Sequence, residues 1–545
     1  MGKALEMGKT SATGSFYLLL GVATSTVVMA VGTILLTRLL SPAEYGLYTI
    51  AMTPSLTINL FRDWGVNSAI TKHIAGFRAR DKDGEIRSVI VAGLAFEVMT
   101  GFALSIVSLL LASFIASAVF HRPESSYAIS IMSVTIFSGA LLTVAQSSFI
   151  GFERMKLNSL TVVCQSIVKT VTGPVLVIAG YGVLGAVIGY TTSFLAAGII
   201  GLAILYIFLF RPLRKSKIGR SEISKTLKAM LKFGVPISIS TILAGSFAQF
   251  YAFMMPIHAS DTMVGNYQVA ANFSILLSFV TVPISTVLFP AFAKLDPKND
   301  HQLLRTVFAS SIKYTALLLV PATMASMALA SPMINTLFGE KYAYAPFFLV
   351  LYVIFNLFAL IGNLSLPSFL SGLGDTKMLM KQSIVTLSVG IPLAFLLIPS
   401  FGVVGVIMTS LFAGMPGMFW SLYWAWNRYG AKADFESSMR ILASSSLAAV
   451  AAYLSVNFIS VVDWLKLAIG VLVFLMVYVL SAPLIKAVVL ADIENLRAMT
   501  SGLGIVSRIV NVPLVVAEKV FRRCYGQKRG NSSASKLQEK RQKSA

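Results

Sequence analysis

The chain has 545 residues, of which 56% are hydrophobic and 12% are charged, and its formal net charge is +22. A water-soluble domain has about twice that charged fraction, so the composition excludes a soluble globular protein. Apolar runs of about 20 residues recur along the whole chain, and each can cross the hydrocarbon core of a bilayer as a helix. The sequence therefore predicts an all-α polytopic membrane protein.

Fourteen transmembrane helices are predicted. The first apolar run is longer than the hydrophobic core of a signal peptide and is not followed by a small-residue cleavage site, so we expect it to remain as a span. In chain order the spans cover 14–36, 46–71, 88–111, 126–149, 158–180, 183–210, 234–257, 263–290, 314–337, 345–370, 382–399, 403–426, 440–461 and 464–485.

Basic residues are unevenly divided between the two sides of this topology. With a cytosolic N-terminus, 38 of the 44 Lys and Arg residues fall in the tails and cytosolic loops, and four fall outside: Arg38, Arg122, Lys341 and Lys466. This is the positive-inside pattern, so we expect a multi-pass protein of the cell membrane with both termini cytoplasmic. Orientation and anionic lipid headgroups then explain the net charge, and nucleic acid is not expected as a partner.

The chain repeats itself at an interval of roughly 220 residues. The stretch "SPAEYGLYTIA" (41–51) resembles "SDTMVGNYQVA" (260–270), with Ser41 matching Ser260 and Gly46 matching Gly265. Six spans, an even number, separate equivalent positions. The two copies must therefore share one orientation in the membrane, as parallel repeats do.

The repeat and the composition together predict five segments. They are an N-terminal six-helix lobe (1–209), an amphipathic cytosolic linker (210–233), a C-terminal six-helix lobe (234–427), two extra transmembrane helices (428–490) and a basic cytosolic tail, partly disordered (491–545). Apolar residues of the linker recur at helical spacing between Ile223 and Leu231, so we expect it to lie on the membrane surface. The final forty or so residues are polar and basic, which predicts disorder.

Four ionisable residues fall inside predicted spans of the N-terminal half. Arg62 and Asp63 lie roughly 15 Å into the bilayer in the second span, and Glu97 and Lys169 have similar depths in the third and fifth. Insertion scales put the cost of each at about 2.5 to 3.5 kcal/mol, so we expect the four to face one another or water. Neighbours on a helix point about 100° apart. Arg62 and Asp63 therefore need partners on other spans, for which Glu97 and Lys169 are the candidates.

The second copy of the repeat carries no charge at the corresponding positions. Thr281, Val282 and Thr315 replace the first three charged residues, and the counterpart of Lys169 falls within 387–390. Charges that only held the fold together should be needed in both copies. A bound ligand or coupling ion in a hydrated cavity explains them better, with structural pairing as the alternative.

The chain has no catalytic, nucleotide-binding or metal-binding motif. Its four histidines lie far apart, and Cys164 and Cys524 fit neither a disulfide framework nor a metal site. The stretch "GKALEMGKT" has five residues between its glycines where a phosphate-binding loop requires four. We therefore predict no catalytic residue, no metal and no cofactor, and we expect secondary transport.

Three stretches, "ILLTRLLSPAEYGLYTIA" (34–51), "RDWG" (62–65) and "FIGFERMKLNS" (149–159), resemble the polysaccharide-transport (Wzx-type) flippases. These belong to the multidrug, oligosaccharidyl-lipid and polysaccharide exporter superfamily, and the resemblance spans residues 10–490. It implies two six-helix lobes around a central cavity. It also implies transport of a lipid-linked oligosaccharide, carried on polyprenyl phosphate or pyrophosphate, from the cytosolic to the outer leaflet by alternating access.

The family offers no invariant site motif, so the site is assigned from depth and charge. Arg62, Lys169 and Gln165 are the candidates for substrate binding, and Asp63 and Glu97 for coupling to H⁺ or Na⁺. The four charges balance, whereas flippases of this family tend to have a cationic cavity. Two alternatives stay open: a cation-coupled multidrug antiporter of the same superfamily, and a membrane glycosyltransferase or ligase, although the outer loops are only a few residues long.

Overall fold

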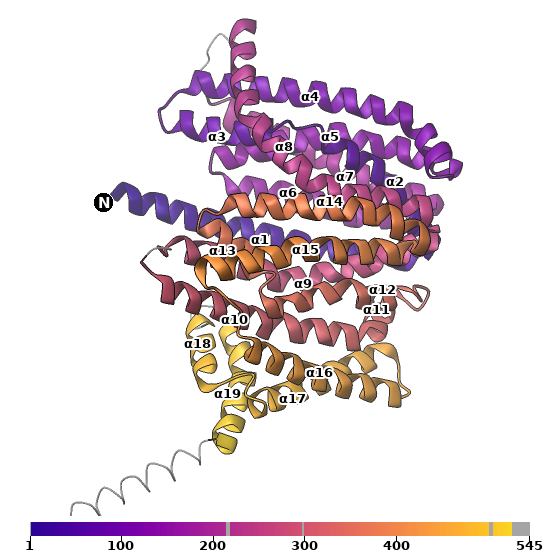
Figure 1. The fold of residues 1–545 in the computed structure, drawn as a ribbon. Coiled ribbons are helices and arrows are strands. Elements are labelled where there is room, and N and C mark those ends of the chain that lie inside the picture. The colour runs from indigo at the N-terminus through magenta and orange to yellow at the C-terminus, as the bar shows by residue number, and fades with distance from the viewer. Residues whose placement is uncertain (1, 214–218, 297–298, 501–504, 526–545) are drawn as a thin grey trace, which may run out of the picture. The chain divides into compact units, whose positions relative to one another are not determined.

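The structure is a computed structural model that describes residues 2–213, 219–296, 299–500 and 505–525, with the backbone alone at some positions (Figure 1). Within these ranges every regular element is a helix. Ten helical segments are long and apolar enough to cross a membrane, or eleven if one bent pair is a single span. One of the ten, Met155–Phe210, holds two of the predicted spans. The all-α polytopic class is thereby confirmed.

The described chain forms two compact units. The first contains 1–268 and 394–406, and the second contains 269–393 and 407–545. The three divisions between these units, at 268/269, 393/394 and 406/407, all fall within helices. Complete helices of the first unit are α1 (Gly2–Leu39), α2 (Pro42–Asn59), α3 (Val66–Arg78), α4 (Asp83–Phe114), α5 (Ser126–Gly151), α6 (Met155–Leu176), α7 (Gly182–Ile204) and α8 (Arg220–His258).

Helix α2 begins where the sequence has "SPAE". The Ser41 hydroxyl accepts a hydrogen bond from the Glu44 backbone N–H at 3.2 Å, and the Glu44 carboxylate accepts one from the Ser41 N–H at 2.7 Å. This capping box satisfies two backbone donors that a helix start leaves free. Pro42 at the first helical position needs no such partner. The local sequence thus defines the start of α2.

Two equivalent glycines of the repeat allow α2 to approach the first turns of α9 (Asp261–Ala293). A Cβ atom on Gly46 would overlap the backbone oxygen of Asp261, and one on Gly265 would overlap the backbone oxygen of Pro42. The Arg122 side chain pairs with Asp261 beside this crossing. Glycine is therefore required at both positions for the two backbones to meet.

Helix α8 extends from Arg220 to His258 without interruption, so the predicted linker continues directly into the seventh span. Met230 is fully buried in a core with Val66, Ile70 and Val89, and the apolar linker residues from Ile223 to Leu231 pack against that core. The prediction that this apolar face lies on the membrane surface is wrong, because residues of α3 and α4 cover it.

The second unit holds most of α9, α14 (Thr376–Phe401) and α15 (Val403–Tyr429). Its complete elements are α10 (His301–Ala328), α11 (Ala330–Phe338), α12 (Ala345–Val353), η5 (Ile354–Ile361), α13 (Ser365–Gly372), α16 (Phe435–Phe458), α17 (Asp463–Leu484), α18 (Leu490–Thr500) and α19 (Ile505–Tyr525). The predicted tenth span is bent by 48° between η5 and α13.

Part of the predicted disordered tail is helical. Helix α19 occupies 505–525, and its Leu514 and Ala517 are buried in a core with residues of α10, α16 and α17. Overall composition predicts disorder here because basic residues are frequent. Apolar residues placed at helical spacing nevertheless give the segment a face that packs. Residues 526–545 lie outside the described part of the chain.

Candidate functional site

The second predicted span is broken in the middle. Residues 60–65 separate α2 from α3, and the backbone takes positive φ values at Trp64 (48°) and Gly65 (75°). A Cβ on Gly65 would overlap the backbone of Gly234 in α8, so the turn needs glycine for its conformation and for this close approach. The continuous helix predicted over 46–71 is therefore wrong at this point. Arg62 and Asp63 lie in the break and do not follow helical spacing.

Arg62 forms a buried ion pair with Glu97 of α4. The Arg62 Nη1 atom lies 2.9 Å from Glu97 Oε2, and the side chains are 4% and 0% exposed. Arg62 Nε donates to Asn59 Oδ1 at 2.9 Å, and both terminal nitrogens donate to Thr143 Oγ1 at 3.2 Å. A buried charge pair is tolerated only when its remaining donors are also satisfied, and these neutral residues supply that. The predicted Arg62–Glu97 partnership is therefore present.

Asp63 joins the same network through Asn67. The Asp63 Oδ1 atom accepts from the Asn67 backbone N–H at 2.8 Å and from Asn67 Nδ2 at 2.9 Å. Asn67 Nδ2 also donates to Glu97 Oε1 at 2.8 Å. Asp63 thereby accepts one of the free backbone N–H groups in the first turn of α3 and is linked to Glu97 by the Asn67 amide.

We call the six residues Asn59, Arg62, Asp63, Asn67, Glu97 and Thr143 the charged cluster. It holds two carboxylates and one guanidinium, so one formal negative charge is in excess. The Asn67 Oδ1 atom is buried and has no hydrogen-bond partner among the described residues. A bound proton or small cation could neutralise this excess negative charge and contact the unpartnered oxygen.

Lys169 lies apart from the charged cluster. Its Nζ atom is 4.9 Å from the ring centre of Tyr190 on α7, which is cation–π distance. No ion pair joins Lys169 to an acidic residue in the described ranges, so the structure does not form its expected pairing with Asp63. The four predicted charges thus occupy two places in the first unit.

Two neutral polar residues, Gln165 and Tyr190, lie on the same helix as this lysine or against it. Gln165 lies one turn earlier on α6 and is half-buried. Neither its amide nor the Tyr190 hydroxyl makes a hydrogen bond within the described part of the chain. The Tyr190 ring packs near Phe194 at 5.1 Å and Tyr48 at 6.4 Å between centres. We call Gln165, Lys169 and Tyr190 the lysine site, which offers one cation and two neutral polar groups to an anionic ligand.

The neutral residues of the charged cluster, and Tyr190 of the lysine site, are not predicted from the sequence. Asn67 follows Asp63 by four residues, and an aspartate and an asparagine at this separation near a helix start can form a hydrogen bond, so that signal could have found it. Asn59, Thr143 and Tyr190 carry no comparable signal in the sequence. In the second copy, Thr315 is buried in place of Glu97, and the side chains of Thr281 and Val282 lie outside the described residues.

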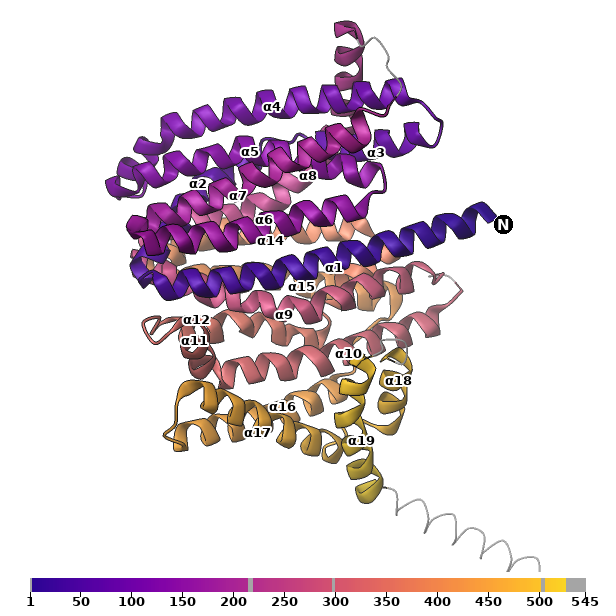
Figure 2. The same cartoon turned by 180° about the vertical axis from the view of Figure 1, so that it is seen from behind.

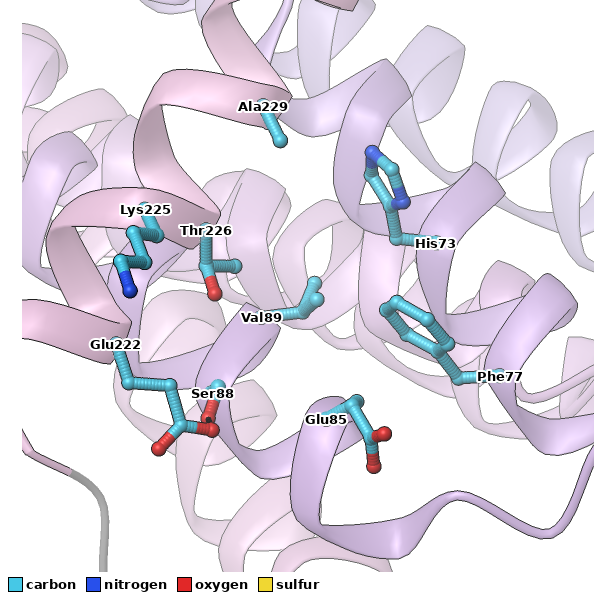
Figure 3. Close-up of a pocket in the computed structure, with 9 residues that line it drawn as sticks. All are labelled: His73, Phe77, Glu85, Ser88, Val89, Glu222, Lys225, Thr226 and Ala229. Carbon is cyan, nitrogen blue, oxygen red and sulfur yellow. Dashed lines mark hydrogen bonds between the residues drawn. The ribbon is translucent and has the colours of Figure 1, made fainter.

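A separate cavity of about 270 Å³ lies between α3, α4 and α8 (Figure 3). It is lined by His73, Phe77, Glu85, Ser88, Val89, Glu222, Lys225, Thr226 and Ala229, and the Ser88 hydroxyl donates to Glu222 at 2.8 Å. Its acidic and basic side chains favour neither an anion nor a cation, and it contains no residue of the charged cluster or the lysine site. Among the described residues, no group of three His, Cys, Asp or Glu side chains could hold a metal ion.

Two protein-family models each match more than half of the chain. The model described as "Polysaccharide biosynthesis protein" matches residues 11–296, and the model described as "Lipid II flippase MurJ" matches residues 170–480. Together they extend over both copies of the repeat.

Curated relatives are 22% to 25% identical to this chain over the aligned segments. The succinoglycan biosynthesis transport protein ExoT of Rhizobium meliloti is 24% identical over 322 residues, which cover 57% of this chain and 59% of ExoT. The probable lipid II flippase MurJ of the same organism is 25% identical over 310 residues, covering 53% of this chain and 55% of that protein. The probable flippase AglR of Haloferax volcanii is 22% identical over 263 residues, covering 48% and 53%. The matches therefore span somewhat more than half the length of these relatives.

Solved structures share the fold. The lipid II flippase MurJ in an inward closed conformation has a TM-score of 0.67 at 16% identity, covering 84% of this chain and 97% of that one. An inward-facing multidrug resistance MATE transporter of the MOP superfamily has a TM-score of 0.62 at 17% identity, covering 75% and 94%. At these identities the likeness shows the fold alone.

Proposed function

Because the chain belongs to the polysaccharide biosynthesis protein family, among the flippases of the MOP superfamily, we propose that it flips a lipid-linked oligosaccharide between leaflets. The carrier would be polyprenyl phosphate or pyrophosphate, and the direction cytosolic to outer, by alternating access. The chain is a multi-pass membrane protein. A cell-membrane location with both termini cytoplasmic belongs to the proposal and is supported by the distribution of its basic residues.

The observation that carries the proposal is the lysine site. Lys169 is a cation within a transmembrane helix that has no acidic partner in the described chain, and its neighbour is an aromatic ring. A phosphate in a low-dielectric site needs such a cation. Gln165 and Tyr190 can supply neutral hydrogen bonds to phosphate or sugar hydroxyls. Arg62 differs, because a phosphate that reached it would have to displace Glu97.

The charged cluster would bind the ion whose movement is coupled to transport. H⁺ or Na⁺ bound at Asp63 or Glu97 would cancel the excess negative charge and could use the unpartnered Asn67 oxygen. Binding of this ion would also weaken the ion pair between Glu97 and Arg62. Arg62 could then act as a second cation for the substrate. The break at 60–65 lies between α2 and α3, where a change in this network would alter the angle of the two helices.

Two alternatives are less well supported. In a multidrug antiporter, Asp63 and Glu97 would bind an organic cation, but Arg62 and Asn67 already engage both carboxylates. For the glycosyltransferase or ligase alternative, the matched relatives are named as transport proteins and flippases, which supports transport.

Deletion of the gene tests the function. We expect a lipid-linked saccharide to accumulate on the inner leaflet and surface glycan to fall, with both restored by the unaltered gene. Lys169→Arg should restore transport at least in part, whereas Lys169→Glu should not, at equal membrane abundance. Lys341→Glu, a reversal at an exposed residue of the predicted outer loop between the ninth and tenth spans, is the matched control and should restore it fully. Normal surface glycan in the deletion strain, together with altered drug susceptibility, would instead establish the antiporter.

A further inference from the structure

Helices α14 and α15 lie side by side and are joined at one end by polar contacts (Figures 1 and 2). The carboxylate of Asp375, the residue before α14, accepts the Trp424 indole N–H at 2.7 Å and the Tyr429 hydroxyl at 3.3 Å. The Ser421 hydroxyl donates to Gln382 Oε1 at 3.1 Å. Because its single donor is engaged, the Trp424 ring has a defined orientation at this end of the helices.

Two basic side chains lie against this ring. Lys381 Nζ is 5.8 Å from the ring centres of both Trp420 and Trp424. The Arg428 guanidinium carbon is 5.5 Å from the centre of the Trp424 ring and 5.6 Å from that of Tyr429. These are cation–π distances. Both basic side chains are exposed, and neither forms an ion pair with a carboxylate in the part of the chain that the structure describes. Their charges are therefore available to an anionic ligand.

This end of the two helices lies at a membrane surface. Helices α14 and α15 are both long and apolar enough to span a bilayer. Lys381 directly precedes the predicted span 382–399, and Arg428 follows the predicted span 403–426 by two residues. Tryptophan and tyrosine are enriched at this depth, where one edge of the ring meets the headgroups. The predicted topology assigns this end to the cytosolic side.

The face of α14 that carries Lys381 is turned to the outside of the protein and continues into the span. Exposed residues recur on it at intervals of four, three, four and three: Lys377, Lys381, Ile384, Ser388 and Ile391. No residue from 384 to 391 is charged. Exposed isoleucines on a spanning helix contact acyl chains, because water at this depth would be unfavourable beside apolar surface. The stripe therefore faces lipid within the bilayer and ends in two lysines at its surface.

The exposed face of α15 is aromatic. Phe419, Tyr423 and Trp426 are 50%, 58% and 57% exposed, and their intervals of four and three residues place them on one side of the helix. Trp420, which contacts Lys381, is 41% exposed. Both helices thus offer apolar surface for acyl chains next to the two cations.

We propose that Lys381, Trp420, Trp424 and Arg428 form a site for the phosphate of an anionic phospholipid in the cytosolic leaflet, and we call these residues the tryptophan site. Because both cations lie against Trp424, one headgroup can reach both, and each can donate to its phosphate oxygens. The cytosolic leaflet is the one that carries anionic lipid. Exposed faces on two helices suit the two acyl chains of a phospholipid, whereas a polyprenyl phosphate has one chain. The site does not depend on the proposed transport activity.

Tryptophan fluorescence of the full chain in bilayers tests the site. Trp64→Phe, Trp426→Phe and Trp464→Phe leave Trp420 and Trp424 as the two reporters. Brominated phosphatidylglycerol, added at increasing mole fraction to phosphatidylcholine bilayers, should quench them with a severalfold higher apparent affinity than brominated phosphatidylcholine. Equal quenching by the two lipids would overturn the proposal. Quenching by aqueous iodide and by neither lipid would also overturn it, because the rings would then face water.

Charge variants test which residues hold the phosphate. Lys381→Gln with Arg428→Gln should abolish the preference for phosphatidylglycerol, whereas Lys381→Arg with Arg428→Lys should keep it. The matched control is Lys377→Gln with Lys432→Gln, which removes two exposed charges that contact no aromatic ring among the described residues. This control should retain the preference. A loss as large as that of the first pair would refute the site and assign the preference to surface charge in general.

Competition distinguishes the two sources of a lipid phosphate. Polyprenyl phosphate should relieve the quenching no better than an equal mole fraction of unbrominated phosphatidylglycerol. Relief at a severalfold lower mole fraction would overturn the assignment to phospholipid, because the occupant would then be a polyprenyl-linked molecule.

Discussion

Arg62 Nη1 and Glu97 Oε2 lie 2.9 Å apart, and both side chains are buried within the first unit. One belongs to the break after α2 and the other to the middle of α4, so the pair ties two segments that are distant in sequence. Each side-chain nitrogen of Arg62 also donates a hydrogen bond to a neutral side chain, either Asn59 or Thr143. Substitutions of Glu97 and Arg62 can therefore separate the contribution of the ion pair from that of these neutral hydrogen bonds.

Removing one partner of this pair should destabilise the protein more than removing both. Arg62→Met or Glu97→Gln alone disrupts a buried ion pair, which costs about 3 to 5 kcal/mol, and the double variant should recover part of that loss. Thermal unfolding of the detergent-solubilised protein measures the effect. Arg440→Ala, which breaks an exposed pair with Glu436, should cost at most about 1 kcal/mol. Equal losses for the exposed and buried pairs would contradict this account.

Asp63→Asn should separate stability from coupling. Asparagine keeps a side-chain oxygen that can accept the Asn67 backbone N–H, so stability should be retained, whereas Asp63→Ala removes this hydrogen bond and should lose about 1 kcal/mol. The charge is lost in both variants. If the charged cluster carries the coupling ion, transport by Asp63→Asn should no longer respond to an H⁺ or Na⁺ gradient. Gradient-driven flipping in proteoliposomes is the measurement, and an unchanged gradient dependence would exclude Asp63 from coupling.

The Tyr190 ring should matter more than its hydroxyl for the position of Lys169. A partly exposed cation–π contact contributes about 0.5 to 1 kcal/mol, so Tyr190→Leu should weaken apparent substrate affinity by about two- to fivefold. Tyr190→Phe keeps the ring and should stay close to the unaltered protein. Tyr181→Leu removes an exposed tyrosine of the same unit and is the control. A Phe variant as impaired as the Leu variant would assign the effect to a hydrogen bond.

Alanine at Gly46 or Gly265 should force α2 and α9 apart. Each added Cβ meets a backbone oxygen of the other helix, and overpacking of this kind costs about 1 to 3 kcal/mol. Gly76→Ala on α3, where a Cβ would meet nothing within 4 Å, should be neutral or stabilise by up to about 1 kcal/mol. Thermal unfolding of the three variants tests the contrast. A loss at Gly76 equal to that at Gly46 would show that the effect does not depend on the close approach of the two helices, and would contradict this account.

The fold class and the Arg62–Glu97 pair could be predicted because they follow from strong local signals. Apolar runs define spans, and an ionised residue at depth requires an opposite charge at the same depth. The partner of Lys169 could not be predicted in this way. A tyrosine ring carries no formal charge, so pairing opposite charges at equal depth does not identify Tyr190 as a partner. The position of this ring against α6 also depends on how the helices pack.

The break in the second span and the helix at 505–525 were missed for different reasons. Gly65 takes its positive φ against Gly234, a residue 169 positions later that no local pattern connects to it. Composition predicts disorder in the tail because it counts the basic residues but contains no information on where they fall around a helix. Periodicity within 512–523 contains that information.

The crossing of α2 and α9 pairs equivalent positions of the repeat in a reciprocal way. Pro42 occupies in the first copy the place of Asp261 in the second, and each lies against the glycine of the other. The contact is thus isologous, like one across the two-fold axis of a homodimer. In such a dimer every substitution appears on both sides at once. Fusion of the two copies into one chain removes that constraint, so Asp261 can bind Arg122 while its counterpart remains a proline that starts a helix.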